Sequence, residues 1–244
     1  MALERKMTSY KDEQVMLSWT GTMFEYLMPV LWMKIFPNTI IDETTRGAVR
    51  AQQRYADDKG IPWGISEASC SIINAAGHYH YEAFGVPGIA VSRDLSRDLV
   101  VSPYSTFLSL MVDPKGAIKN IQRMKDLGFL GSHGFFESVD YTKSRLKKGE
   151  KFEICRCWLA HHSGMSLMAV ANILCDGSSQ RRFHSEPMVE SIERLLHEKT
   201  LRNVQLEPSG AADEAAAMTA NSAAADKADQ KNWAAAPSKL NSAA

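Results

Sequence analysis

The chain lacks a surplus of charge of either sign, because its 28 Lys and Arg residues balance 28 Asp and Glu residues. A nucleic-acid or anionic-membrane partner would need a basic patch that this balance does not provide. Apolar runs also stay well short of the roughly 18 residues that a membrane span requires. The N-terminus is charged and has no apolar core of the secretory type. We therefore expect an ordinary globular protein with no nucleic-acid partner.

Cysteine is scarce, with four residues spread over 244 positions: Cys70, Cys155, Cys157 and Cys175. Such a count does not form a disulfide framework in a chain of this length. Cys155 and Cys157 have one residue between them, whereas a zinc knuckle needs two. Free thiols in a reducing compartment are the better interpretation. No phosphate-binding glycine loop is present either, so we expect neither a metal nor a cofactor.

What the sequence does contain is a series of apolar segments joined by loops rich in Gly and Pro. Their spacing predicts helices, because apolar residues recur at intervals of three and four. The expected helices cover residues 23–36, 42–58, 115–127 and 186–199. The strongly apolar segment 152–174 is broken at residues 160–166, and an apolar helix is expected after this break. We find no two-residue alternation long enough for a sheet, so the predicted fold class is all-α. Residues 1–206 form the expected domain, and residues 207–244 an Ala/Ser-rich tail that is disordered or weakly helical.

Three loops each combine glycine, aromatic residues and an acid. The acids are Glu25, Glu67 and the pair Glu137 and Asp140. Aromatic rings stack on the apolar faces of sugars, whereas carboxylates bind sugar hydroxyls. Cleavage of a glycosidic bond needs two carboxyl groups on opposite sides of that bond, and burial against a ring raises the pKa of a carboxylic acid. The repetition of the pattern favours a saccharide-binding cleft.

Each of these residues also has a structural interpretation. Glu25 could cap a helix, Glu67 could pair with a buried arginine, and Glu137 could be a loop acid. The adjacent His161 and His162 point to different sides of a helix and are poor joint metal ligands; one of them could bind a sugar hydroxyl or an acid. A hydrolase that uses Cys155 or Cys157 with His161 is possible in principle, but no neighbour indicates an activated thiol.

Six motifs, in order, resemble the glucoamylase-like domain of bacterial cyclic β-1,2-glucan synthases. They are Ser18-Trp-Thr-Gly-Thr-Met-Phe-Glu-Tyr-Leu-Met-Pro29, Pro62-Trp-Gly-Ile-Ser-Glu67, Phe84-Gly-Val-Pro-Gly88, Asp98-Leu-Val-Val-Ser-Pro-Tyr104, Gly134-Phe-Phe-Glu-Ser-Val-Asp-Tyr-Thr142 and Ala160-His-His-Ser-Gly-Met-Ser166. Residues 182–189 resemble the stretch that follows this domain. The resemblance covers about residues 17–200.

This resemblance implies an (α/α)6 toroid whose cleft binds β-1,2-linked glucan, and transglycosylation or hydrolysis by two glutamates. Carried over by motif, Glu67 and Glu137 are the expected catalytic pair, with Glu25 as the third candidate. The cleft would be lined by Trp19, Tyr26, Trp63, Tyr104, Asp140, Tyr141, His161 and His162. The expected partners are a β-1,2-glucan or related oligosaccharide and the other domains of a glucan synthase. The location would be cytoplasmic, or on the cytoplasmic side of the inner membrane as part of that synthase.

The chain also departs from the family pattern. A ring of twelve helices, at about 12 residues per helix plus loops, needs roughly 300 residues or more, so we expect an incomplete toroid. Ala68-Ser-Cys70 replaces the usual Ser-Ala-Tyr, and Ser163 stands where Gln is common. The alternative functions are a catalytically inactive glucan-binding or domain-packing fragment, or an unrelated helical interaction protein.

Overall fold

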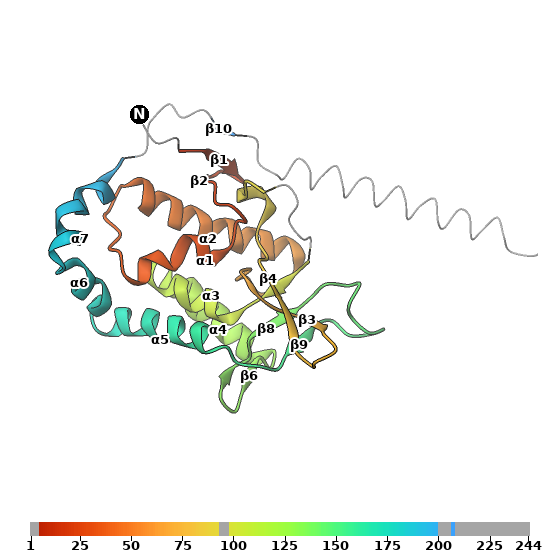
Figure 1. Cartoon of the computed structure of the whole chain (residues 1–244). Coiled ribbons are helices and arrows are strands. Elements are labelled where there is room, and N and C mark those ends of the chain that lie inside the picture. The colour runs from red at the N-terminus through yellow and green to blue at the C-terminus, as the bar shows by residue number, and fades with distance from the viewer. Residues whose placement is uncertain (1–4, 93–97, 200–205, 208–244) are drawn as a thin grey trace, which may run out of the picture.

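A computed structural model of the chain describes residues 5–92, 98–199 and 206–207, and these form a mixed α/β structure (Figure 1). The helices are α1 (Met23–Leu27), α2 (Ile40–Lys59), α3 (Pro103–Leu108), α4 (Pro114–Asp126), α5 (Ala160–Leu174), α6 (Ser178–His184) and α7 (Pro187–Ile192). Single 3-10 turns lie at η1 (Pro29–Leu31), η2 (Pro87–Ile89), η3 (Ser109–Met111) and η4 (Glu193–His197).

Short strands form four small sheets among the described residues. The strands are β1 (Met7–Tyr10), β2 (Glu13–Met16), β3 (Ala68–Ile73), β4 (Tyr79–Glu82), β5 (Val100–Val101), β6 (Leu130–Gly131), β7 (Gly134–Phe135), β8 (Ser138–Asp140), β9 (Glu153–Cys155) and β10 (Leu206–Glu207). Their orders are β10-β1-β2, β3-β4, β5-β8-β9 and β6-β7. All pairs are antiparallel except β1 with β10.

The prediction of an all-α, toroid-like fold is therefore wrong. The segments that separate the helices are not irregular loops, because strands such as β3 and β8 pair their backbone groups with neighbouring strands. Most of these strands are only two or three residues long, too short to display the alternation by which a strand is recognised in a sequence. The sheets matter for function because they contain or border most of the motifs.

Two of the expected helices are confirmed, and their ends follow from capping. Helix α2 begins after Thr39, whose side chain accepts the N–H of Asp42, and ends at Gly60, whose φ of 70° suits glycine. Helix α4 begins after Asp113, which accepts the N–H of Gly116, with Pro114 in the first turn.

Two other expected helices are interrupted. The segment 23–36 divides into α1 and η1, with Pro29 at the start of the 3-10 turn. Proline has no N–H to continue the helical hydrogen bonding, and its ring crowds the preceding turn. The segment 186–199 likewise divides into α7 and η4. In the apolar segment 152–174, residues 153–155 form β9 and α5 begins at Ala160, so the stretch expected to break the segment is the first part of a helix.

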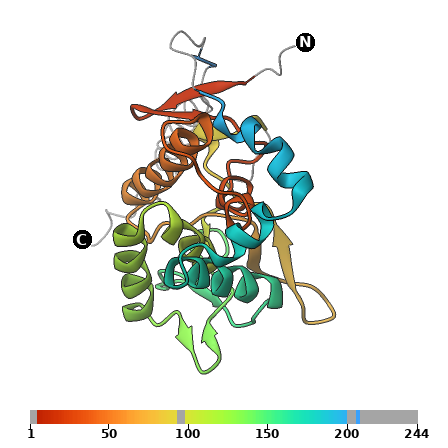
Figure 2. The same cartoon turned by 90° about the vertical axis from the view of Figure 1, so that its left-hand side faces the viewer.

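The helices surround one hydrophobic core, and β3, β4, β8 and β9 lie together at one end of them (Figure 1). Helices α5, α6 and α7 follow one another along one side (Figure 2). The largest fully buried side chains include Phe84, Phe129, Met23, Leu27 and Ile65. In the described ranges, no helix combines the length and apolar character needed to cross a membrane. The predicted tail from residue 208 onward lies outside the described residues.

Candidate active site

The two glutamates expected to form the catalytic pair stand just before two neighbouring strands. Glu67 precedes β3, and Glu137 precedes β8. The backbone N–H of Ser69 donates to Oε1 of Glu137 at 3.3 Å, and the hydroxyl of Ser138 donates to the carbonyl of Ser69. Further along β3, the N–H of Ser71 donates to Asp140 at 3.0 Å. These contacts bring the two loops together.

Two buried amides hold the loop that carries Glu67. Gln52 of α2 donates to the carbonyl of Ile65 at 2.9 Å and accepts its N–H at 2.8 Å. Asn120 of α4 donates to the carbonyl of Trp63 at 2.8 Å. Between them, Gly64 adopts a φ of +117°, and a Cβ there would lie 2.6 Å from the hydroxyl of Ser105. The backbone before Glu67 is thus fixed by two helices and tolerates no side chain at position 64.

The carboxylate of Glu137 is buried and has partners on both oxygens. Only 4% of the residue is exposed. Oε1 accepts the Ser69 N–H, and Oε2 lies 2.9 Å from Nδ1 of His162. With a proton on Nδ1, the imidazole donates to the carboxylate, which then accepts from N–H groups at both oxygens.

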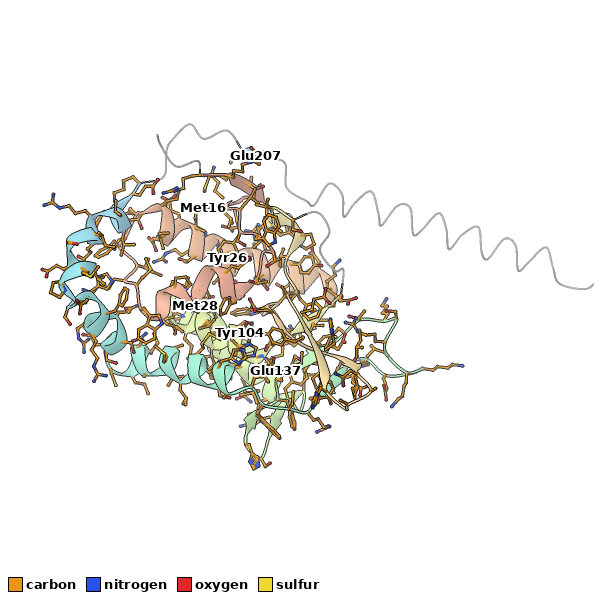
Figure 3. The ribbon with its side chains drawn as sticks, viewed as in Figure 1. Met16, Tyr26, Met28, Tyr104, Glu137 and Glu207 are labelled. Atoms are coloured by element: carbon orange, nitrogen blue, oxygen red, sulfur yellow. The ribbon has the colours of Figure 1, made fainter. Side chains whose placement is uncertain are left out.

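His162 lies in the first turn of α5, and its ring lies nearly parallel to a tyrosine ring. Its ring stacks on Tyr104 of α3, with centroids 3.7 Å apart and planes inclined by 13°. The Tyr104 hydroxyl lies 2.8 Å from Oγ of Ser66 and donates to the backbone carbonyl of Glu67 at 3.1 Å. Burial raises the pKa of Tyr104 well above its ordinary value, so the hydroxyl keeps its proton. Tyr104, which Figure 3 labels, therefore supports both His162 and the Glu67 backbone.

Tyr81 of β4 connects His162 with the side chain of Glu67. Its hydroxyl lies 3.3 Å from Nε2 of His162 and donates to Oε2 of Glu67 at 3.3 Å. Burial, and then the nearby charges of Glu67 and Glu137, raise the pKa of Tyr81. The two glutamates are thus joined through two intervening side chains. The sequence interpretation missed Tyr81, although the alternation His78-Tyr-His-Tyr-Glu82 could have indicated a strand with both tyrosines on one face.

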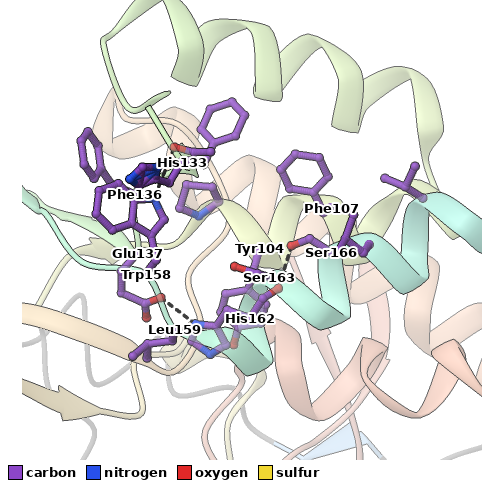
Figure 4. Close-up of a pocket in the computed structure, with 15 residues that line it drawn as sticks. Tyr104, Phe107, His133, Phe136, Glu137, Trp158, Leu159, His162, Ser163 and Ser166 are labelled. Atoms are coloured by element: carbon purple, nitrogen blue, oxygen red, sulfur yellow. Dashed lines mark hydrogen bonds and ion pairs between the residues drawn. The ribbon is translucent and has the colours of Figure 1, made fainter. Parts of the chain in front are cut away.

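A cavity of about 290 Å³ opens beside Glu137 and His162 (Figure 4). Its polar end is formed by these two residues with Ser163 and Ser166, and its other walls are largely aromatic and apolar: Tyr104, Phe107, His133, Phe135, Phe136, Trp158, Leu159, Leu167 and Val170. Glu67 does not line this cavity; it is half-buried behind Tyr81. Such a pocket, apolar with a few converging polar groups, is typical of ligand sites.

An aromatic group on the cavity wall was also missed. The Trp158 ring lies 5.1 Å from that of Phe136 and 5.2 Å from that of His133, and the Arg156 guanidinium lies 5.1 Å from the Phe136 ring centre. Trp158 remains 39% exposed. Its only signal in the sequence is an aromatic residue shortly before the His161-His162 motif.

Glu25 has a different environment from the other two acids. Thr22 and Glu25 form a capping box at the start of α1. The Glu25 carboxylate accepts the N–H groups of Thr20 and Thr22 and the hydroxyl of Ser18, at 2.8 to 3.1 Å. The structural interpretation of Glu25 as a helix cap is confirmed, and we do not include Glu25 in the catalytic pair proposed below.

The remaining candidates are divided between the interior and the surface. Trp63 and Tyr26 belong to the hydrophobic core, where the Tyr26 hydroxyl donates to the carbonyls of Met16 and Ile89 (Figure 3). Trp19 is 67% exposed and is not part of the cavity lining. His161 is exposed, with its ring 4.1 Å from that of His162.

Asp140 and Tyr141 lie behind the site rather than on the cavity. Asp140 is fully buried and forms an ion pair with Arg145 at 2.7 Å. The Tyr141 hydroxyl is buried and has no hydrogen-bond partner in the described part of the chain. Asp140 is occupied by its ion pair and the Tyr141 hydroxyl is buried, and neither residue lines the cavity.

Burial determines the state of the two cysteine thiols that precede α5. Among the described residues, no three His, Cys, Asp or Glu side chains are grouped as metal ligands. Cys155 is fully buried, and this burial raises its pKa to about 12. Burial also raises the pKa of Cys157. Neither thiol is therefore poised as a nucleophile beside His161.

Comparison with known proteins identifies relatives. The family model Glycoamylase, described as "Putative glucoamylase", matches residues 1–187. The chain is 41% identical over 192 residues to the cyclic β-(1,2)-glucan synthase NdvB of Rhizobium meliloti (strain 1021). The alignment covers 78% of this chain and 7% of the synthase.

Solved structures share the fold at low sequence identity. An endo-β-1,2-glucanase from Chitinophaga pinensis, in complex with sophorotriose and glucose, superposes with a TM-score of 0.57 at 15% identity, covering 79% of this chain and 46% of that one. An endo-β-1,2-glucanase mutant from Talaromyces funiculosus, in complex with β-1,2-glucan, gives 0.61 at 18% identity, covering 79% and 38%. The chain thus spans a small part of the synthase and less than half of each glucanase. Since the family model covers most of its length, the chain belongs to the Glycoamylase family.

Proposed function

We propose that this chain is a carbohydrate-active enzyme module that cleaves or transfers glycosidic bonds of a β-1,2-linked glucan, with Glu67 and Glu137 as its carboxyl pair. The observation that carries the proposal is the juxtaposition of these two glutamates, which His162 and Tyr81 connect beside an aromatic-lined cavity. The substrate class follows from the relatives, whose names specify β-1,2-glucan synthesis or cleavage.

The two carboxyl groups differ in a way that suits different roles. Glu137 is buried, lines the cavity and faces N–H donors on both oxygens, and we assign it as the nucleophile or base. Glu67 is half-buried and has the Tyr81 hydroxyl as its side-chain partner. With Glu137 as the nucleophile or base, the second carboxyl group of the pair has to protonate the leaving oxygen, so we assign Glu67 as the general acid.

The aromatic wall supplies the substrate-binding surface. Phe136 and Trp158 provide ring faces a short distance from Glu137, on the same cavity. Sugar rings present apolar C–H faces that stack on such surfaces. Ser163, Ser166 and the exposed His161 would form hydrogen bonds with the hydroxyl groups of the sugar. We propose that this wall orients the glucosyl unit next to the scissile bond.

The decisive experiment incubates the purified 244-residue chain with linear β-1,2-glucan and analyses the products by chromatography and mass spectrometry. Shortened, elongated or cyclic products are expected from the wild type, and none from Glu67→Gln or Glu137→Gln. Linear β-1,3-glucan, which differs in linkage alone, serves as the control substrate. A wild-type chain that leaves β-1,2-glucan unchanged would contradict the enzyme proposal.

A second candidate is a glucan-binding or domain-packing module without catalysis. It is favoured by one observation: Glu67 does not line the cavity beside Glu137. Absence of products, together with unchanged glucan binding in the Glu67→Gln/Glu137→Gln double variant, would support this alternative.

A further inference from the structure

We propose that Tyr81 and His162 form a proton path that returns a proton to Glu67 after each glycosidic bond is broken. This inference rests on the proposed function, because it assigns Glu67 as the group that protonates the leaving oxygen. Neither residue touches the reacting atoms in our assignment, so both are positioning residues for the carboxyl pair.

The path is continuous in the structure. From Glu137 Oε2 to Nδ1 of His162 the distance is 2.9 Å, and from Nε2 of the same ring to the Tyr81 hydroxyl it is 3.3 Å. The Tyr81 hydroxyl then reaches Oε2 of Glu67 at 3.3 Å. Each member can both release and accept a proton at the atom that faces its neighbour.

The ring of His162 is fixed in the orientation that the path requires. It is 4% exposed, and stacking on Tyr104 prevents rotation out of the plane. Glu137, in front of β8, lies 2.9 Å from Nδ1 of the ring. The N-terminus of α5, which carries the positive end of the helix dipole, and His161 lie beside the ring as well. Glu67, Tyr81 and Tyr104 are further titratable groups near it.

The proton balance of the step is simple. After Glu67 has given its proton to the leaving oxygen, it is a carboxylate that accepts from the Tyr81 hydroxyl. Tyr81 transfers this proton to Glu67 and takes the Nε2 proton of the His162 imidazolium. The products are neutral Glu67, intact Tyr81 and neutral His162, whose Nδ1–H still donates to Glu137. One positive and one negative charge are neutralised in this step. Glu137, as base, takes a proton from the attacking water, and the His162 ring regains its Nε2 proton through solvent before the next turnover, so water is the only further reactant.

Tyr81 carries the proton without becoming charged itself. Its pKa is raised by burial and by the two nearby glutamates, which makes a tyrosinate unfavourable. The hydroxyl must therefore gain one proton as it gives up the other, which its two hydrogen-bond partners allow. This arrangement restricts Tyr81 to a relay and excludes it as a base.

The chain offers a matched control for Tyr81 on the same strand. The hydroxyl of Tyr79 accepts the N–H of Arg156 at 3.3 Å, whereas that of Tyr81 contacts Glu67 and His162. Both are partly exposed, so replacement by Phe removes a hydroxyl without opening a cavity. Comparison of the two variants separates the relay from general effects on β4.

The primary test follows the pH midpoint of the His162 ring by ¹⁵N NMR in the full chain and does not depend on activity. We expect Glu67→Gln to shift this midpoint by about 0.5 pH unit or more, because a charged neighbour is removed. In a Tyr81→Phe background the same substitution should shift it by less than half as much. In a Tyr79→Phe background the shift should be retained. Equal shifts in the wild-type, Tyr81→Phe and Tyr79→Phe backgrounds would overturn the proposal. The His162→Gln variant identifies the His162 resonance, and circular dichroism confirms that each variant is folded.

A kinetic test distinguishes this proposal from the proposed function. For β-1,2-glucan conversion, Tyr81→Phe should lower kcat by about 100-fold with KM within about twofold, the range for loss of one proton-transfer step. Tyr79→Phe should stay within about twofold of wild type. A Tyr81→Phe variant with unchanged kcat would overturn the proton path. A wild-type chain without any conversion would contradict the proposed function, while the NMR comparison would still decide whether Tyr81 couples Glu67 to His162.

Discussion

Glu25 and Glu137 look alike in the sequence, since both stand among aromatic residues and near a glycine, but their partners in the structure differ. Every partner of the Glu25 carboxylate lies within seven residues along the chain. The partners of Glu137 are Ser69 and His162, which lie 68 and 25 residues away. The first carboxylate organises a helix start, and the second is placed by the tertiary fold.

The contrast shows how a structural acid is distinguished from a site acid. Local partners such as those of Glu25 are available to any segment that starts a helix, and their contribution is to helix stability. Distant partners such as His162 exist only after β3, β8 and α5 have come together. A carboxylate held by distant polar groups beside a cavity is consequently the better candidate for chemistry.

The largest expected effect separates these two acids by activity. Glu137→Gln should lower kcat for β-1,2-glucan by about 1,000-fold or more, because the amide can neither attack nor act as a base. Its near-identical shape should leave the thermal unfolding temperature close to that of the wild type. The measurement is initial rate of product formation, with stability followed by circular dichroism.

The control for this comparison is Glu25→Gln. Once the rate is corrected for the folded fraction, its kcat should stay within about threefold of wild type, because the capping role affects stability rather than chemistry. Comparable losses of kcat in both variants would show that the distinction between local and distant partners fails.

Asp140 provides the largest expected effect on stability. It is fully buried and is paired with Arg145, which also contacts Asp98. Asp140→Asn leaves part of the Arg145 charge uncompensated, so the free energy of unfolding should fall by about 3 kcal/mol. Urea denaturation measures this change, and a loss below about 1 kcal/mol would contradict it.

The same ion pair predicts how stability depends on pH. Burial would raise the pKa of Asp140, but hydrogen bonds from Arg145, Ser71 and Thr142 outweigh burial and lower it. A carboxyl group with a lowered folded-state pKa contributes stability above its unfolded pKa, about 3.9, and loses it as pH falls through the folded value. The wild type should therefore lose stability below about pH 4 more steeply than Asp140→Asn. Parallel acid-unfolding curves would exclude this contribution.

A smaller effect on stability is expected from the cap itself. Glu25→Ala removes the acceptor for two backbone N–H groups and the Ser18 hydroxyl, so the free energy of unfolding should fall by about 1 to 2 kcal/mol. Thr22→Ala removes the other half of the capping box and should cost a similar amount. If the double variant loses less than the sum of both, the two side chains act as one cap, as double-mutant analysis would reveal.

Part of the fold was predictable because it depends on local chemistry. The ends of α2 and α4 follow from Thr39, Gly60 and Asp113, which act within one turn of the chain. The sheets were not predictable in the same way, since β5 and β8 each have only two or three residues and are defined by each other. Pro29 signalled an interruption that the apolar pattern around it concealed.

The candidate acids could be named from the sequence, but the side chains that connect them could not. Glu67, Glu137 and His162 belong to motifs that resemble a known family, so their importance could be inferred without a structure. The role of Tyr81 depends on the pairing of β4 with β3, which places it opposite Ser69. The position of Trp158 beside Phe136 depends on contacts between residues far apart in the chain. Burial of Trp63 and Tyr26 likewise depends on the packed core, which a motif does not specify.

The smallest expected effect concerns two tyrosines from the predicted cleft lining. Tyr141 has a buried hydroxyl without a partner among the described residues, whereas the hydroxyl of Tyr26 donates to two carbonyl groups. Removing a satisfied hydroxyl costs a hydrogen bond and leaves acceptors unpaired, while removing an unsatisfied one relieves a desolvation cost. Tyr26→Phe should lower the free energy of unfolding by about 1 to 2 kcal/mol, and Tyr141→Phe should leave it unchanged or raise it by up to about 1 kcal/mol. Urea denaturation of both variants measures the difference. A clear loss of stability in Tyr141→Phe would show that its hydroxyl has a partner in solution, and a loss of glucan binding would return Tyr141 to the substrate site.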